Sequence, residues 1–464
     1  MVIISGEDTK MSGNRGSRRK RLSKLEFFEF PNSDSAVELA DEYGYLPYMT
    51  ERYLQMFGNE ETIELLKAND QLNPITIRIN TLKSSPSEVL GKLEKNGYEF
   101  TKIDEVLNAY KLIYDLPHEE LVTQSSNRKP KVKREWDKDT GIYSEDELDA
   151  ELYSDDLDET GFARSKRELA SLEWGQLEGK GKADVNTKEE KTDNKKPQQK
   201  KNDKKTKENT PSISEENKRE RRLRKIYSSK IATLGSTHEY LMGKYYLQGH
   251  ASMLPALYLN PEPDDLIIDM CAAPGSKTTQ MAQMMENKGN IIATEIDDKR
   301  IKSLIYNLRR CAVRNTTVLN FDAQNLKKLG LNPSKILLDA PCSGEGVIRT
   351  DPSRKRTMHP THIKRFMNTQ LNLLKSAVEA VKTHGYIMYS TCSIAPEENE
   401  FIIQKILDRY PKIEIRPVND NKGLPGFTEI FGQELHMDFL KARRYFPHIH
   451  DTHGFFYCLL YKNE

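Results

Sequence analysis

The 464-residue chain is 36% hydrophobic and 30% charged, which is more polar than an ordinary globular domain and predicts that part of it is disordered. Its net charge of +1 sums opposite local blocks, so the total does not indicate a partner. Five cysteines without a CxxC pair argue for a reducing compartment and against a disulfide framework or a metal site. No long apolar run and no signal peptide are visible, so we expect a soluble intracellular protein without a membrane span.

Residues 1–33 are predicted to form a basic disordered tail. Residues 1–24 hold seven Lys or Arg against two acids, with a cluster at 18–21. Such a composition cannot build a core, and it suits a nuclear address or an arm that touches RNA. A plain solvated tail explains the cluster equally well.

Residues 34–115 are predicted to be a small α+β module that binds RNA. Periodicity predicts one or two helices, a half-buried strand, a helix and a second strand, at residues 34–69, 73–82, 87–96 and 109–114. Thr76, Arg78 and Asn80 share one face of the first strand. That polar face is one way to hold a sugar-phosphate backbone, and an ordinary exposed sheet face is the simpler interpretation.

Residues 116–225 are predicted to be a disordered charged insertion. Residues 143–159 hold nine acids and no base, 195–207 hold seven lysines, and 218–225 hold six Lys or Arg. Blocks of like charge repel and bury little apolar surface. Both tryptophans, Trp136 and Trp174, lie inside the insertion, so we expect a short motif within 130–178 that docks on assembly-factor proteins.

Residues 226–464 are predicted to form an α/β domain with a mostly parallel twisted sheet and helices on both faces. Strand patterns alternate with helix patterns, which is typical of a Rossmann-like fold. The strands are expected at 266–270, 291–296, 317–321, 335–340, 386–389, 413–416 and 455–461, and the helices at 277–287, 299–312, 361–381 and 397–407.

The loop at 269–278 (Asp-Met-Cys-Ala-Ala-Pro-Gly-Ser-Lys-Thr) follows the first of these strands and opens a helix. Glu295 ends the next strand, where an acid can accept both ribose hydroxyls of a nucleoside. The loop is not GxGxxG, and Pro274 removes one backbone donor from what would be a phosphate cradle. A nucleoside without phosphates is expected, which favours S-adenosylmethionine over NAD. Asp322 would then lie at the adenine amino group.

Two cysteines stand where strand patterns end. Asp339 and Cys342 follow the apolar run 336–338, and Cys392 follows the pattern at 386–389. The C5 carbon of a pyrimidine has no lone pair, so it must be activated by a nucleophile added at C6, and a thiolate suits that task. Asp339 bound to the base N3 would stabilise the resulting charge. Two thiols in one crevice can divide this addition from the later removal of the C5 proton.

Four motifs in this order resemble the Sun-type RNA cytosine-C5 methyltransferases. They are the loops at 269–278 and 339–346, Thr391-Cys392-Ser393 with 396–400, and the closing segment 443–456. The resemblance covers about 47–115 and 228–462. Segments 76–83, 234–241 and 351–353 are similar to the nucleolar branch of this family, which modifies large-subunit ribosomal RNA.

The resemblance implies that Cys392 is the C6 nucleophile, that Cys342 helps to release the product and that Asp339 serves the base. It also implies an S-adenosylmethionine pocket lined by Cys271, Ala272, Ala273, Pro274, Gly275, Ser276, Lys277, Glu295, Asp322 and Asp339. Two of these depart from the family pattern, since Ser276 replaces a usual Gly and Glu295 a usual Asp. Serine is tolerated where its φ is negative, and Glu still reaches a ribose, so a retained cofactor site is expected.

Two functions fit these residues. The first is methylation of a cytosine in large-subunit ribosomal RNA, and the second is a pre-ribosome assembly scaffold that binds RNA and proteins, with methylation secondary or lost. The two can coexist, and nuclear, nucleolar localisation is expected for both. Intact Asp339, Cys342 and Cys392 favour the enzyme. The remaining cysteines after predicted elements, Cys311 and Cys458, are expected to be inert packing residues.

Overall fold

The computed structural model describes residues 27–113, 136–137, 142–143 and 234–464, which fall into two units. One unit runs to Arg134 and resumes at Leu234, and the other is Glu135–Thr233. In the second unit the four described residues form two short antiparallel strands, β4 (Trp136–Asp137) and β5 (Ile142–Tyr143). The rest of the predicted insertion, which includes most of the segment 130–178 expected to hold a docking motif, and residues 1–26 of the predicted tail lie outside the described residues.

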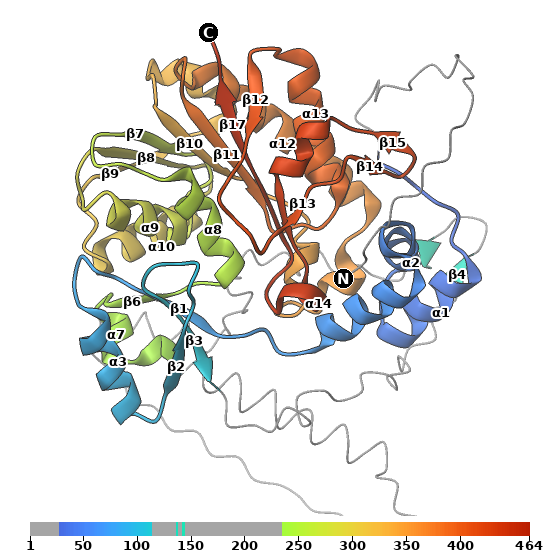
Figure 1. Cartoon of the computed structure of the whole chain (residues 1–464), viewed down its shortest axis with the longest axis horizontal. Helices are drawn as coiled ribbons and strands as arrows, with labels where there is room; N and C mark the ends of the chain where they lie inside the picture. Colours follow the sequence, from blue (N-terminus) through green and yellow to red (C-terminus); the bar gives the residue numbers. More distant parts are fainter. Residues whose placement is uncertain (1–26, 114–135, 138–141, 144–233) are drawn as a thin grey trace, which may run out of the picture. The chain divides into compact units, whose positions relative to one another are not determined.

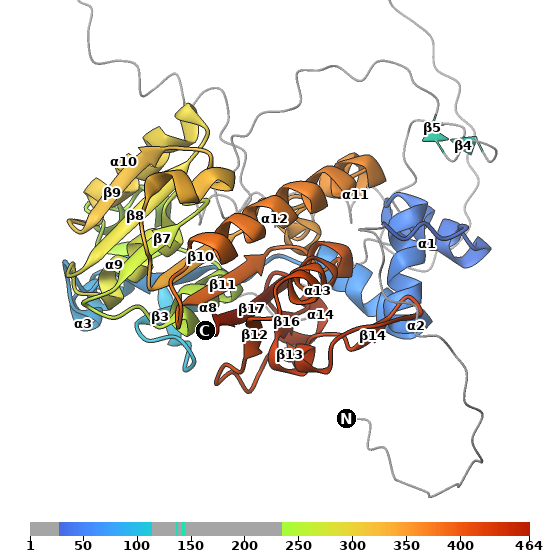
Figure 2. The same cartoon turned by 90° about the horizontal axis from the view of Figure 1, so that it is seen from above.

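A large mixed sheet forms the centre of the first unit (Figures 1 and 2), as the alternating pattern predicts. Its strand order is β13-β16-β17-β11-β10-β7-β8-β9, with β12 paired beside β17. The five strands from β11 to β9 are parallel, and β12, β13, β16 and β17 run antiparallel to their neighbours. The bounds are β7 Leu266–Asp269, β8 Asn290–Glu295, β9 Thr316–Asn320, β10 Lys335–Asp339, β11 Tyr386–Thr391, β12 Ile413–Arg416, β13 Leu424–Pro425, β16 Arg443–Tyr445 and β17 Phe455–Lys462.

Helices cover both faces of this sheet, and the strand residues alternate between two cores. Ile336 and Leu338 of β10 pack with α12 (Pro360–Ala380) and α13 (Glu400–Arg409) on one face. Leu337 between them packs with α8 (His250–Leu259) and α9 (Ser276–Met284) on the other. An apolar run without polar alternation is therefore what a strand buried on both faces requires.

The remaining described elements of the first unit are helices, 3-10 helices and a short hairpin. The other helices are α1 Asp34–Tyr43, α2 Pro47–Asp70, α3 Pro86–Lys95, α7 His238–Leu241, α10 Asp298–Arg310, α11 Arg354–Thr357 and α14 Pro447–His450. The 3-10 helices are η1 Ala323–Leu329, η2 Glu345–Val347, η3 Pro396–Glu398 and η4 Met437–Lys441, and a separate hairpin pairs β14 Glu429–Ile430 with β15 Gln433–Glu434. Among the described helices, none has the length and apolar character needed to cross a bilayer.

The small module has a four-stranded antiparallel sheet in the order β2-β3-β1-β6. Its strands are β1 Thr76–Ile79, β2 Glu99–Lys102, β3 Ala109–Ile113 and β6 Tyr245–Leu247. Strand β6 follows the insertion in sequence and pairs with β1. The module therefore includes a strand from beyond the insertion, in the segment that the sequence pattern assigns to the α/β domain.

The polar face of β1 is buried, so its predicted exposure is wrong. Thr76, Arg78 and Asn80 are each at most 5% exposed. The Arg78 guanidinium donates to the Gln248 side chain (Nε–Oε1 3.0 Å), the Thr279 hydroxyl (Nη2–Oγ1 2.8 Å), Gln283 and the Ser276 carbonyl. Asn80 donates to the carbonyls of Gly243 and Cys311, 2.8 Å each. This face holds the module against α9, which begins where the predicted cofactor loop ends, and it does not offer its groups to a nucleic acid.

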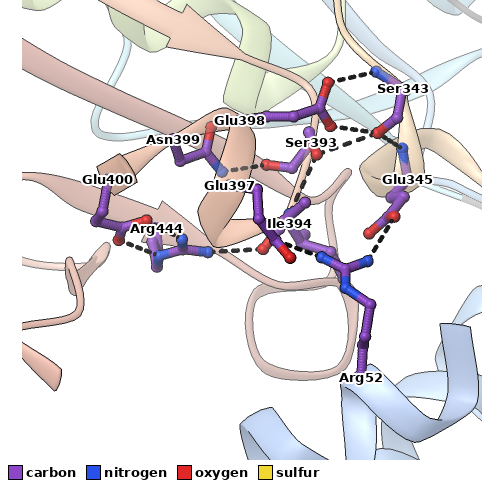
Figure 3. Close-up of polar contacts among 11 residues, drawn as sticks. Arg52, Ser343, Glu345, Ser393, Ile394, Glu397, Glu398, Asn399, Glu400 and Arg444 are labelled. Carbon is purple, nitrogen blue, oxygen red and sulfur yellow. Dashed lines mark hydrogen bonds and ion pairs between the residues drawn. The ribbon is translucent and has the colours of Figure 1, made fainter. Parts of the chain in front are cut away.

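Helix α2 is tied to two loops of the sheet by a buried arginine (Figure 3). Arg52 Nη1 lies 3.1 Å from Glu345 Oε1 in η2, and Nη2 lies 2.5 Å from Glu397 Oε2 in η3. All three side chains are at most 1% exposed. A buried charge is tolerated only when it is paired with an opposite charge. This contact therefore fixes the N-terminal helix to the loops that follow β10 and β11.

Replacing Arg78 by Met should lower the free energy of unfolding by about 3 kcal/mol, because several buried acceptors lose their donor. Urea denaturation of the full chain measures this difference. Lys92→Met, in an exposed ion pair on α3, is the matched control and should change little. Equal stability of Arg78→Met and the wild type, with weaker RNA binding by the variant, would restore the nucleic-acid role of this face.

Glu345 should make stability depend on pH. Burial raises its pKa from 4.5 to about 7 against the opposing charge of Arg52. Because the folded pKa lies above the unfolded value, the stabilisation is complete below pH 4.5 and is lost as pH rises through 7. We expect the free energy of unfolding of the wild type, relative to Glu345→Gln, to fall by about 2.5 kcal/mol between pH 5 and pH 8.

Urea denaturation at pH 5, 6.5 and 8 measures this difference. Glu64→Gln, at an exposed side chain of α2, is the matched control for the chemical change itself. A difference for Glu345→Gln that stays constant with pH would show that Glu345 titrates normally in the folded protein.

Candidate functional site

The predicted cofactor loop connects β7 to α9. Gly275 precedes the helix with φ of 105°, and a Cβ there would lie 2.9 Å from Leu304 Cδ1, so only glycine fits without a shift. Ser276 is the first residue of α9 and does not have a positive φ, which meets the condition for serine at this place. Its Oγ is buried and has no hydrogen-bond partner among the described residues. Pro274 follows a cis peptide bond from Ala273.

The ends of β7, β8 and β9 lie side by side at this loop. The Ala272 amide donates to the Thr294 carbonyl (3.0 Å), and the Phe321 amide donates to the Glu295 carbonyl (3.0 Å). Cys271 packs against the core that contains α12, and burial raises the pKa of its thiol well above the ordinary value. The loop, Glu295 and the segment that carries Asp322 are therefore brought to one edge of the sheet.

Glu295 has one carboxylate oxygen engaged and one available. Oε1 accepts from the amides of Ile296 (2.9 Å) and Asp297 (3.1 Å). Oε2 is buried without a hydrogen bond, and Arg300 Nη1 lies 3.3 Å from it as an ion pair. A buried carboxylate oxygen of this kind fits the donor hydroxyls of a ribose. Asp322, by contrast, caps η1 and accepts from the Gln324 amide (3.0 Å) and the Asn325 side chain (3.2 Å).

Asp339 is held at the end of β10 by two donors. Lys277 Nζ lies 2.8 Å from Oδ2, and the Ser390 hydroxyl donates to Oδ1 at 2.6 Å. Lys277 also donates to Ser252 of α8 (2.8 Å), and its ammonium lies 5.6 Å from the centre of the Phe455 ring. Lys277 thus links the predicted cofactor loop to the end of β10, and the Asp339 side chain keeps 27% of its surface exposed.

The two thiols predicted at strand ends meet. Cys342 Sγ and Cys392 Sγ are 3.0 Å apart, and both cysteines are free. The Cys342 thiol, as donor, lowers the pKa of Cys392, while this hydrogen bond and burial raise the pKa of Cys342 well above the ordinary value. The pair therefore favours a thiolate at Cys392 and a thiol at Cys342, and the thiolate is the form that attacks carbon.

Arg354 is a site residue that the strand-end pattern does not reveal. Its guanidinium donates to the Ser343 carbonyl beside Cys342. It also occupies the space that a side chain at Gly344 would need, with Nη1 2.6 Å from the position of such a Cβ. Its positive charge helps to lower the pKa of Cys392. The only signal for it in the sequence is its place directly after the motif at 351–353.

The two cysteines expected to be packing residues are buried. Cys311 and Cys458 are at most 2% exposed, and burial raises both thiol pKa values, as inert packing residues require. Among the described residues, no group of three or more His, Cys, Asp or Glu side chains is arranged to hold a metal ion.

Comparison with known proteins gives two family matches. Residues 256–461 match the family 16S rRNA methyltransferase RsmB/F, and residues 47–116 match the ferredoxin-like domain of RsmF/B-like methyltransferases. A crystal structure of a methyltransferase homologue protein from Pyrococcus horikoshii is 27% identical, with a TM-score of 0.61, and covers 93% of this chain and 99% of its own. The structure of NSun6 from the same organism with SFG shares the fold at a TM-score of 0.59 and 24% identity, over 89% and 97% of the two chains.

Curated relatives match about half of the chain. The human 28S rRNA (cytosine(4447)-C(5))-methyltransferase is 41% identical over 235 residues, which is 50% of this chain and 29% of the relative. The Schizosaccharomyces pombe 25S rRNA (cytosine-C(5))-methyltransferase nop2 is 38% identical over 51% and 40% of the two chains. The aligned part thus spans less than half of either relative. With both matched segments in their order, the chain belongs to the RsmB/F, or Sun-type, family of rRNA cytosine-C5 methyltransferases.

Proposed function

We propose that this chain methylates C5 of a cytosine in large-subunit ribosomal RNA, with S-adenosylmethionine as the methyl donor. The observation that carries the proposal is the 3.0 Å contact between Cys342 and Cys392 beside Asp339, since C5 methylation needs both a nucleophile and a base. The eukaryotic relatives are named 28S and 25S rRNA cytosine-C5 methyltransferases, which supports the large subunit as the source of the substrate.

The residues at the edge of the sheet fit the cofactor. Residues 271–277 would pass around its amino-acid part, Glu295 Oε2 would accept from the ribose hydroxyls, and Asp322 would lie toward the adenine. Asp339 would line the same pocket on the side of the base. S-adenosylmethionine supplies an electrophilic methyl group when bound. The buried Ser276 hydroxyl and Glu295 Oε2, both without hydrogen-bond partners, are the polar groups that this pocket would satisfy.

The chain's own residues then carry out base activation. The Cys392 thiolate adds to C6, and Asp339, fixed by Lys277 and Ser390, shares a proton with the base N3, which offsets the negative charge that the addition creates. Once Cys392 is bonded to C6, Cys342 loses its thiol proton to water. After the methyl group has moved to C5, the Cys342 thiolate removes the C5 proton. The C6–S bond then breaks, the double bond re-forms, and Cys392 leaves as a thiolate.

Cys392→Ala should abolish methylation, because it removes the nucleophile of the thiol pair whose sulfur atoms lie 3.0 Å apart. Bisulfite sequencing of large-subunit ribosomal RNA from cells that carry the variant measures it, with Cys311→Ala as the matched control at a buried cysteine. Unchanged methylation in the Cys392→Ala cells would refute the catalytic assignment.

Cys342→Ala should accumulate a covalent RNA adduct through Cys392, since addition and methyl transfer proceed but elimination lacks its base. A denaturing gel of the variant incubated with total RNA and S-adenosylmethionine shows the adduct as a slowly migrating band. The double variant Cys342→Ala, Cys392→Ala should show no such band. Free turnover by Cys342→Ala at the wild-type rate would contradict the division of labour.

A role in large-subunit assembly is a second candidate, favoured by the charge blocks at 143–159, 195–207 and 218–225. In this role the chain would bind pre-ribosomal RNA and, through 130–178, assembly-factor proteins in the nucleolus. The basic cluster at 18–21 and the eukaryotic relatives support that location. Normal particle assembly in Cys392→Ala cells would separate this role from catalysis, and identical pull-downs with and without 130–178 would remove it.

A further inference from the structure

Glu398 is a fully buried acid that touches neither thiol but contacts the residue after Cys342. It ends η3, six residues after Cys392, and is 0% exposed. Its Oε1 accepts from the Ser343 amide at 2.8 Å, and its Oε2 accepts from the Ser343 hydroxyl at 2.5 Å (Figure 3). One carboxylate therefore binds both the backbone and the side chain of the residue next to Cys342.

The same group reaches the loop that carries Cys392. The Ser343 hydroxyl, which donates to Glu398, lies 3.2 Å from the Ser393 hydroxyl. Ser393 in turn accepts from the Ala395 amide at 3.1 Å, which shapes the turn after Cys392. Glu398 thus reaches the serine after Cys342 directly and the serine after Cys392 through it.

Gln370 of α12 joins Glu398 to the residue before Cys342. Its Nε2 donates to Glu398 Oε1 and to the Pro341 carbonyl, at 2.9 Å each. Cys342 is therefore held from both neighbours, through Pro341 and through Ser343. A shift of Glu398 would release both holds and would change the 3.0 Å separation between the thiols.

We propose that Glu398 is a positioning residue, which aligns the Cys342 thiol as a hydrogen-bond donor to the Cys392 thiolate by fixing the serines that follow both cysteines. This proposal deepens the function proposed above and rests on it for its catalytic meaning. The thiol geometry itself can be tested without any methylation assay.

Uncharged hydrogen-bond donors hold the buried Glu398, and the nearby arginines pair with other acids. Burial raises the pKa of Glu398, and its serine and glutamine donors oppose that rise. Arg52 is paired with the adjacent Glu397, and Arg444 with Glu400, so the next acids in the run already have their own cations (Figure 3). The donors to Glu398 are the uncharged Ser343 and Gln370, and these are the residues that hold the loop of Cys342.

The test is the pH dependence of Cys392 alkylation by iodoacetamide in the full chain, followed by mass spectrometry of the Cys392 peptide. The midpoint pH reports the thiolate, whereas a change in access scales the rate equally at every pH. Glu398→Gln places an amide against the Ser343 donors and should raise the midpoint, which lowers the alkylation rate at neutral pH about tenfold for each unit. Ser343→Ala should shift it in the same direction by less.

Two comparisons identify the cause of the shift. Asp420→Asn changes another buried acid, which binds Tyr445 and Tyr457 away from the thiol loops, and it should leave the midpoint unchanged. Cys342→Ala should raise the midpoint as Glu398→Gln does, and adding Glu398→Gln to it should shift the midpoint no further.

An unchanged midpoint in whichever of Glu398→Gln and Ser343→Ala folds would overturn the proposal. So would a further shift on top of Cys342→Ala. Neither result would refute the proposed methylation, which is tested by loss of 5-methylcytosine in Cys392→Ala cells.

Discussion

The parallel pairing of β10 with β11 is the constraint on which the site depends. Its register sets Asp339 opposite Ser390, so the loops that follow leave the sheet together and bring Cys342 to Cys392. On the other side of β10, Leu337 pairs with Asp269 and places the cofactor loop at the same edge. Because a strand slip by one residue would turn every side chain to the other face, the apolar run of β10 also fixes the chemistry.

Buried polar contacts carry this order outward from the sheet. Arg52 fixes α2 to the loops after β10 and β11, and Arg78 fixes the small module to the helix that begins at the cofactor loop. Each of these arginines is at most 2% exposed, so losing a partner would leave a costly unpaired group. The N-terminal segments are therefore part of the framework of the site.

The strand ends could be predicted because apolar runs and their following acids and thiols are local signals. Asp339, Cys342 and Cys392 were found in this way, and the structure brings them together. The role of Arg78 could not be predicted, because a polar face that binds another part of the chain alternates like one that faces water. Likewise β6 pairs with β1 across the insertion, and no local pattern reports a partner so distant in sequence.

The Cys392 sulfur is the atom proposed to attack the base. RNA that contains 5-azacytosine tests it most directly, because nitrogen at position 5 leaves no proton to remove and the adduct persists after attack. Mass spectrometry of the digested complex of wild-type protein, RNA and S-adenosylmethionine locates the attached nucleotide. If Cys392 attacks the base, the nucleotide will be attached to the Cys392 peptide. A nucleotide on the Cys342 peptide would contradict this role of Cys392.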